Sequence, residues 1–328
     1  MMRKRLVGFA ALTAGALMLT ACSQGSLTGE PTEEADGTEA AGELTPITVG
    51  LLQIAPAAAV QLGIDEGIFE KHGLDVEVQL GQGGAALLPA VSSQSIEFAV
   101  GNPLSVLVAA SQGLEMSIVA GYSQIADPAP SGLVVMESSG IKTWSDLEGK
   151  TVALNAVNTQ GDLTTKAMVE EDGGDPNAVT FTEIAFPDQL AQLEQGRIDA
   201  SWVPEPFLSA SLATEGATFL GDPLAAIDDL YTMVTFSSTA YAEANPDVVE
   251  AFVAAIAEST DLAMEDTELY RAAIVDYTGM PADVVENINL ERLSGDLDPG
   301  IIEELSAMAL KYGFVDSEPD LDKVIFEK

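Results

Sequence analysis

The feature that most constrains the fold is an alternation of short apolar segments with helical patterns, and it occurs twice along the chain. In the first unit, strands are predicted at residues 47–52, 75–80, 96–100 and 117–122, and helices at 57–66, 85–93 and 104–112. In the second, strands at 151–155, 179–184 and 200–203 alternate with helices at 161–172 and 188–195. Such alternation is typical of α/β proteins with mostly parallel sheets. We therefore predict two α/β lobes.

Two interruptions of the alternation mark predicted crossings between the lobes. A run rich in Pro at residues 127–132 precedes an apolar strand at 133–136, and a second crossing is expected at 224–236. The C-terminal third is predicted to be helical, at 248–264, 268–277 and 300–312. We expect lobe one to comprise residues 45–132 and 237–328, and lobe two, with the hinge strands, residues 133–236.

The N-terminus carries a separate signal. A basic start at residues 3–5 is followed by an apolar run that ends in Leu19-Thr20-Ala21-Cys22. Small residues before the sole cysteine are typical of a bacterial lipoprotein signal peptide, which would comprise residues 1–21. The apolar run of about 14 residues is also shorter than the roughly 20 that a membrane-spanning helix needs. We expect Cys22 to carry the lipid, so that the protein is tethered to the outer face of the cytoplasmic membrane, in a periplasmic or extracytoplasmic location.

The next segment, residues 22–44, is acidic and has almost no large apolar side chains. Such a composition cannot bury enough surface to fold, so we expect a disordered linker. The whole chain has 52 acidic and 13 basic residues and a formal net charge of −39. This excludes nucleic acid as a partner, because that binding needs clustered Lys and Arg. A solvated acidic surface and an acidic docking face both remain compatible with the charge.

The inventory of catalytic residues is small. The chain has one histidine, His72, in a predicted helix-end turn, and one cysteine, which the lipid would use. A single histidine and no other cysteine exclude the usual zinc ligand sets, and the turn around His72 argues against a Ser-His-Asp triad. The chain also lacks a glycine-rich dinucleotide fingerprint and a phosphate-binding loop. We expect a protein that is not an enzyme and needs neither a metal nor a cofactor.

Five loops that lead from strands to helices supply the candidate binding residues. Ligands of open α/β sheets bind at the carboxyl ends of the strands, where such loops lie. The loops are predicted at residues 54–57, 82–85, 102–105, 158–161 and 186–189. The candidate ligand-binding residues in them are Ala55, Gln82, Asn102, Asn158, Thr159 and Gln160.

Three segments resemble a known family. They are Ile47-Thr48-Val49-Gly50 with Gly63-Ile64-Asp65-Glu66-Gly67-Ile68-Phe69-Glu70-Lys71-His72-Gly73-Leu74-Asp75-Val76, then Trp144-Ser145-Asp146-Leu147-Glu148-Gly149-Lys150, and Gly196-Arg197-Ile198-Asp199-Ala200-Ser201-Trp202-Val203-Pro204-Glu205-Pro206-Phe207. They are similar to the substrate-binding proteins of ABC importers in the nitrate, sulfonate, taurine and thiamine-precursor group. The resemblance implies a two-lobed periplasmic-binding-protein-like fold of type II with two hinge crossings. It also implies an ABC permease and a small molecule as partners of a monomer.

The last of these segments adds two candidate binding residues. Pro204 and Pro206 favour an extended bend that turns their neighbours toward the adjacent loops. Trp202 could then provide a stacking wall or simply pack in the core. Glu205 could accept hydrogen bonds from a ligand amine or cap a helix.

The ligand class stays open between two predictions. A sulfonate such as taurine, or nitrate, fits a cleft lined by helix N-termini, which bind anions without a cationic side chain. Alternatively, a thiamine pyrimidine precursor or similar heteroaromatic would stack on Trp202 and bond to Glu205. Two other functional classes are a ligand sensor that presents its closed form to a membrane receptor and a pyrimidine synthase-like enzyme. The latter needs a histidine in the cleft and a cysteine-rich motif, which the sequence does not offer.

Overall fold

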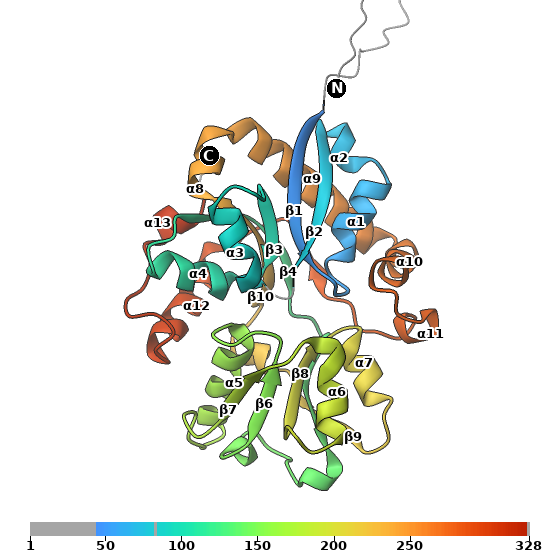
Figure 1. Cartoon of the computed structure of the whole chain (residues 1–328), viewed down its shortest axis with the longest axis vertical. Coiled ribbons are helices and arrows are strands. Elements are labelled where there is room, and N and C mark those ends of the chain that lie inside the picture. Colours follow the sequence, from blue (N-terminus) through green and yellow to red (C-terminus); the bar gives the residue numbers. More distant parts are fainter. Residues whose placement is uncertain (1–43, 82–83, 327–328) are drawn as a thin grey trace, which may run out of the picture. The chain divides into compact units, whose positions relative to one another are not determined.

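The computed structural model describes residues 44–81 and 84–326, which form two β-sheets with flanking helices (Figure 1). The predicted signal peptide, the predicted lipidation site at Cys22 and almost all of the predicted linker lie outside the described residues. Within the described part of the chain, no helix is long and apolar enough to cross a membrane.

The first sheet has six strands in the order β11-β4-β10-β3-β1-β2. β1 pairs in parallel with β2 and β3, whereas β10 runs antiparallel between β3 and β4, and β11 pairs antiparallel with β4. The bounds are β1 Thr45–Leu52, β2 Leu74–Gly81, β3 Phe98–Gly101, β4 Met116–Gln124, β10 Tyr231–Ser238 and β11 Arg292–Leu293.

The second sheet has five strands in the order β7-β6-β8-β5-β9. β6 pairs in parallel with β7 and β8, and β5 is antiparallel to β8 and β9. The bounds are β5 Ser131–Met136, β6 Thr151–Leu154, β7 Thr180–Glu183, β8 Ala200–Pro204 and β9 Ala217–Gly221.

The sheets are therefore mixed, although the sequence pattern predicted mostly parallel ones. In each sheet only three neighbouring strands are parallel, β2-β1-β3 and β7-β6-β8, and these are the strands that helices connect within one sheet. β5 and β10 follow the crossings, so no helical crossover forces them to be parallel to their neighbours. β10 lies entirely in the first sheet, which moves the second lobe boundary from residue 236 to before Tyr231.

Helices cover both faces of each sheet. On the first sheet, α1 and α9 lie on one face, and α3 and α4 lie on the other (Figure 1). The helices associated with this sheet are α1 Ala58–Asp65, α2 Ile68–Lys71, α3 Gly84–Ser92, α4 Pro103–Ser111, α8 Thr239–Ala244, α9 Pro246–Glu265, α10 Thr267–Thr278, α11 Ala282–Val285, α12 Pro299–Lys311 and α13 Leu321–Val324. Those of the second are α5 Gln160–Glu171, α6 Phe186–Glu194 and α7 Phe207–Leu212, with short 3₁₀ turns at Glu137–Ser139, Ser145–Leu147 and Pro223–Ala226.

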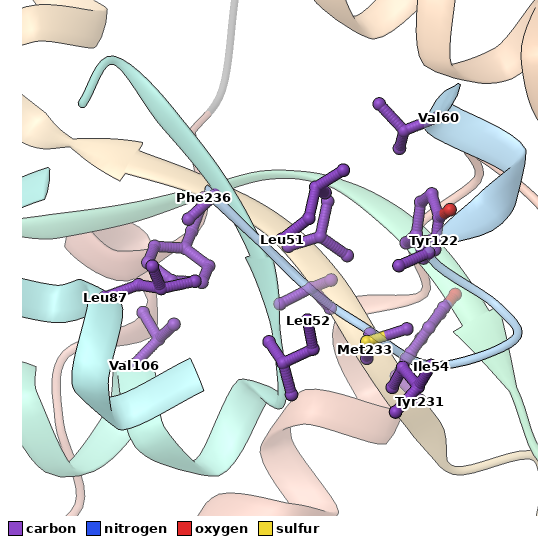
Figure 2. Packing of buried hydrophobic residues seen from close by; sticks show 14 of the residues in the cluster. Leu51, Leu52, Ile54, Val60, Leu87, Val106, Tyr122, Tyr231, Met233 and Phe236 are labelled. Carbon is purple, nitrogen blue, oxygen red and sulfur yellow. The ribbon is translucent and has the colours of Figure 1, made fainter. Parts of the chain in front are cut away.

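The larger core lies mainly between the first sheet and its helices and continues into the second lobe at residues such as Ala153 and Leu163. Figure 2 shows Leu51, Leu87, Val106 and Phe236 packed around the central strands, and all four are buried. Because both faces of a central strand are covered, β1 is apolar and buried at consecutive positions near its carboxyl end rather than at alternate ones. The second sheet has a smaller core of its own, which includes Leu133.

An aromatic stack fixes α9 on the first sheet. The rings of Phe98 on β3 and Phe252 on α9 lie 3.9 Å apart between centroids and within 9° of parallel. Phe69 on α2 packs against the same Phe252 ring, at 6.2 Å. Phe98 and Phe252 are fully buried, so this contact joins three elements that are distant in sequence.

We expect Phe252→Ala to lower the free energy of unfolding by about 3 to 5 kcal/mol, because it removes a buried ring and leaves a cavity. Chemical denaturation followed by circular dichroism would measure the change. Leu310→Ala is the matched control, since Leu310 is 40% exposed on α12 and its loss should cost far less. Equal effects of the two substitutions would contradict the role given to the stack.

Candidate functional site

A cavity lies where the carboxyl ends of strands from both sheets meet, as expected for ligand sites of α/β proteins. It contains about 560 Å³ of empty space, part of it open to solvent. Residues from the first sheet and its loops are Leu52, Ile54, Gly101, Asn102, Thr232, Met233 and Glu291. Those from the second sheet and its surroundings are Ser131, Asn155, Thr159, Gln160, Gly161, Phe186, Trp202, Pro204 and Leu224.

Asn102 belongs to the loop between β3 and α4 and caps that helix. Its Oδ1 accepts the backbone N–H of Ser105 at 2.9 Å, and Pro103 occupies the first helical position, where no N–H is needed. The cap fixes the loop at the edge of the cavity.

The first turn of α5 forms the opposite side. The backbone N–H groups of Asn158 and Thr159 each donate to the Asp162 carboxylate at 2.7 Å, which holds the loop against the helix start. Gln160 reaches across to the first sheet, where its Nε2 donates to the Tyr231 carbonyl at 2.7 Å. This bond joins the two lobes at the cavity.

Aromatic rings form an apolar wall. The ring of Phe186 lies 6.0 Å from that of Trp202 and 5.7 Å from that of Phe207. Gly161 makes room for Leu154, since a Cβ there would lie 2.9 Å from its side chain, while the indole of Trp202 would be in ordinary contact at 3.5 Å. The buried indole Nε1 has no hydrogen-bond partner among the described residues.

Two carboxylates give the cavity its charge. Glu291 is 6% exposed, and it accepts a hydrogen bond from the Thr232 hydroxyl, which also contacts the Ser123 hydroxyl. Ser131 on the opposite lobe donates to Asp222 at 3.0 Å, behind the lining. Burial raises the pKa of Glu291 to about 7, with a smaller contribution from the negative charge of Asp222. Burial likewise raises the pKa of Asp222 to about 7.

The structure brings together four of the eight residues that the sequence analysis selected. Asn102, Thr159, Gln160 and Trp202 line the cavity. Gln82 lies outside the described residues. The other three, Ala55, Asn158 and Glu205, lie close by in the chain but are not part of the lining.

These three residues have structural contacts instead. The Ala55 N–H donates to the Glu205 carbonyl at 3.2 Å, and the Ala55 carbonyl accepts the Tyr270 hydroxyl at 3.1 Å. Asn158 has a positive φ of 58° and turns the chain into α5. The Glu205 carboxylate, with the residue only 2% exposed, accepts from the N–H and hydroxyl of Ser209 and from the N–H of Asn289. Of the two roles predicted for Glu205, helix capping is the one that these contacts describe.

The sequence analysis missed the acidic side of the site. Glu291 comes from the irregular segment before β11, and Thr232 comes from β10, both far along the chain from the selected loops. Phe186 was within a selected loop but was not chosen. Among 52 acidic residues nothing local marks Glu291 as buried, because Leu290 precedes it but the charged Arg292 follows it.

Comparison with known proteins identifies the family. A family model described as NMT1/THI5 like matches residues 57–268. The chain belongs to the NMT1/THI5-like family. The matched range includes the lining residues from Gly101 to Met233, whereas Leu52, Ile54 and Glu291 lie outside it.

Several proteins that are similar to this chain in sequence or structure have names that describe binding proteins. A protein of Escherichia coli (strain K12) named as an aliphatic sulfonates-binding protein is 27% identical over 206 residues, and the match spans 62% of each chain. A protein of the same name from Bacillus subtilis (strain 168) is 25% identical over 292 residues, 86% of each chain. The alkanesulfonate-binding protein SsuA from Xanthomonas axonopodis pv. citri bound to MOPS has a TM-score of 0.73 at 19% identity, covering 88% of this chain and all of that one. This likeness shows a periplasmic-binding-protein-like fold.

The raised pKa of Glu291 predicts how stability depends on pH. A carboxyl group with a higher pKa in the folded state favours folding at low pH, and this contribution is lost as the pH rises from about 5 through 7. Through this group, the wild-type free energy of unfolding should fall by about 2 to 3 kcal/mol between pH 5 and pH 8, and Glu291→Gln should not show this loss. Denaturant unfolding at the two pH values would measure it. As a control, Glu303→Gln changes an exposed residue and should follow wild type; identical behaviour of the two variants would contradict the prediction.

Proposed function

We propose that the protein captures one small solute between its lobes and delivers it to an ABC permease. The observation that carries this proposal is a cavity at the carboxyl ends of both sheets, lined by residues from both lobes. A concave site lined by apolar walls and a few polar groups is typical of small-molecule binding.

The composition of the lining supports binding rather than catalysis. Among the described residues that line the cavity, Glu291 is the one ionisable side chain, and there is no His, Cys, Lys or Arg. The sole histidine, His72, lies elsewhere and its Nε2 contacts Glu258 at 2.9 Å. A general acid and base pair, or a nucleophile with its base, is therefore not assembled by the described lining. The names of the relatives support the same function.

Contacts between the lobes explain how a ligand could act on the whole protein. Besides the bond from Gln160 to the Tyr231 carbonyl, Lys311 and Tyr312 at the end of α12 both bond to Glu170 on α5. A ligand that touches both lobes adds to these contacts and favours the closed arrangement, which a permease can distinguish from an open one.

The sulfonate names of the relatives make sulfonates the first candidate ligands. A sulfonate oxygen could accept from the free indole N–H of Trp202, which supports this class. The heteroaromatic alternative also uses the wall formed by Trp202 and Phe186, but without Glu205, whose carboxylate is occupied by Ser209 and Asn289.

We further propose that the protein acts as a monomer on the outer face of the cytoplasmic membrane, tethered through lipid on Cys22. The order of basic, apolar and small residues before this cysteine supports the anchor.

A ligand of the cavity should stabilise the protein by about 2.7 kcal/mol at a hundredfold excess over its dissociation constant. A thermal-shift panel of sulfonates, nitrate, bicarbonate, pyrimidines and flavins tests this. For any compound that binds, Trp202→Ala should weaken binding at least about tenfold, because it removes an aromatic wall and an N–H donor.

The second tryptophan provides the control for that experiment. Trp144 packs against the smaller core and does not line the cavity, so Trp144→Ala should lower stability without changing affinity. Failure of every compound to stabilise the protein, together with turnover of one of them, would replace the binding function with an enzymatic one.

The lipid anchor has its own test. Cys22→Ser removes the one thiol that can carry the lipid, so the protein should move from the membrane fraction to the soluble fraction. Detection by immunoblot after fractionation measures this, and persistence of the variant in the membrane would refute the anchor.

A further inference from the structure

Glu291 presents a carboxylate to the cavity without a cationic partner. The residue is 6% exposed, and the groups that hydrogen-bond to its carboxylate are the neutral hydroxyls of Thr232 and Ser123. Within the described chain, no Lys, Arg or His lies within ion-pair distance of it. The neighbouring Arg292 pairs with Asp229 at 2.8 Å instead.

A second group in the cavity also needs a donor. Gln160 is 3% exposed and lines the cavity, and its Oε1 has no hydrogen-bond partner among the described residues. The orientation of the amide is fixed, because Nε2 must face the Tyr231 carbonyl to donate to it. The unpartnered atom is therefore an acceptor, like the carboxylate of Glu291.

The surrounding charge has the same sign. Asp222 lies behind Ser131, and its negative charge acts on Glu291, while the lining itself offers no basic side chain among the described residues. A simple anion would add a further negative charge to this buried region, where charge interactions are weakly screened. A positively charged nitrogen would instead pair with the carboxylate and could donate to it and to Gln160.

We propose that the solute carries a protonated nitrogen, as an ammonium or amidinium group, which binds at the carboxylate of Glu291. This rests on the proposed function and names its substrate class: organic cations and zwitterions rather than simple anions. On the other lobe, the indole N–H of Trp202 is a donor without a partner among the described residues. A zwitterion could therefore place its cationic nitrogen at Glu291 and its anionic group at Trp202. Glu291 thereby selects among solutes of similar size.

The test uses two pairs of compounds with matched shapes and different charges. Taurine and propane-1-sulfonate differ by an ammonium in place of a methyl group, and benzamidine and benzoate are similar in shape but opposite in charge. We expect wild-type protein at pH 8, above the pKa of Glu291, to bind the nitrogen cation of at least one pair at least tenfold more tightly than its partner. Isothermal titration calorimetry would measure the affinities.

Variants then assign the preference to one residue. Glu291→Gln should reduce the preference for the cation at least tenfold. Glu291→Asp keeps the negative charge on a shorter side chain and should retain part of the preference. Glu303→Gln is the control: it neutralises an exposed carboxylate on α12, outside the lining, and should leave the preference unchanged.

Three outcomes would overturn the inference: tighter binding of propane-1-sulfonate and benzoate, a preference that Glu291→Gln does not alter, or no binding of either cation. The first outcome leaves the proposed function intact, because the protein would still bind a solute. Failure of the wider solute panel as well would count against the function itself. The two proposals can therefore fail separately.

Discussion

The junction of the two lobes depends on Glu205 more than on any other described residue. Its N–H donates to the Pro130 carbonyl, its own carbonyl accepts from Ala55, and its carboxylate accepts from Ser209 and Asn289. One residue thus fastens the end of β8 to the first crossing, to the loop after β1, to the segment before β11 and to the first turn of α7. A buried carboxylate is costly without such bonds, and here backbone and hydroxyl donors supply them. Because the cavity lies beside this junction, its width is set by contacts that do not involve the ligand.

Much of the cavity could be predicted from sequence because it follows from topology. Parallel strands end at the same edge of a sheet, so the loops after β1 and β3 share an edge of the first sheet and those after β6 and β8 share an edge of the second. Asn102 and Thr159 were selected as polar residues of these loops, and Trp202 was selected because Pro204 and Pro206 follow it and favour a bend toward them. The same local rules could not separate lining residues from supporting ones. Ala55 and Asn158 belong to the right loops, yet their contacts shape the loops themselves.

The parts that sequence reasoning missed depend on long-range pairing. β10 inserts antiparallel between β3 and β4 after the chain has completed the second sheet, and only that register places Thr232 beside the loop that carries Glu291. No periodicity in residues 224–236 specifies which neighbours the strand will find. Burial of Glu291 likewise depends on strands distant in sequence, since its carboxylate accepts from Thr232 on β10, whose hydroxyl contacts Ser123 on β4. In a chain with so many surface carboxylates, composition points toward solvent exposure for each of them, and only the folded structure singles out this one.

The acidic side of the cavity connects stability with selectivity. A carboxylate buried without a cation is unfavourable in the empty protein, and an apolar side chain of similar volume at that position would stabilise the fold. Such a group is understandable where a ligand supplies the missing charge, since the cost is then recovered on binding and recovered only by ligands of the right charge. Gln160 adds a geometric condition, because its free oxygen and its bond to Tyr231 belong to the same amide. A solute that satisfies Glu291 and Gln160 together therefore touches both lobes, which makes recognition of the charge and closure of the cleft a single event.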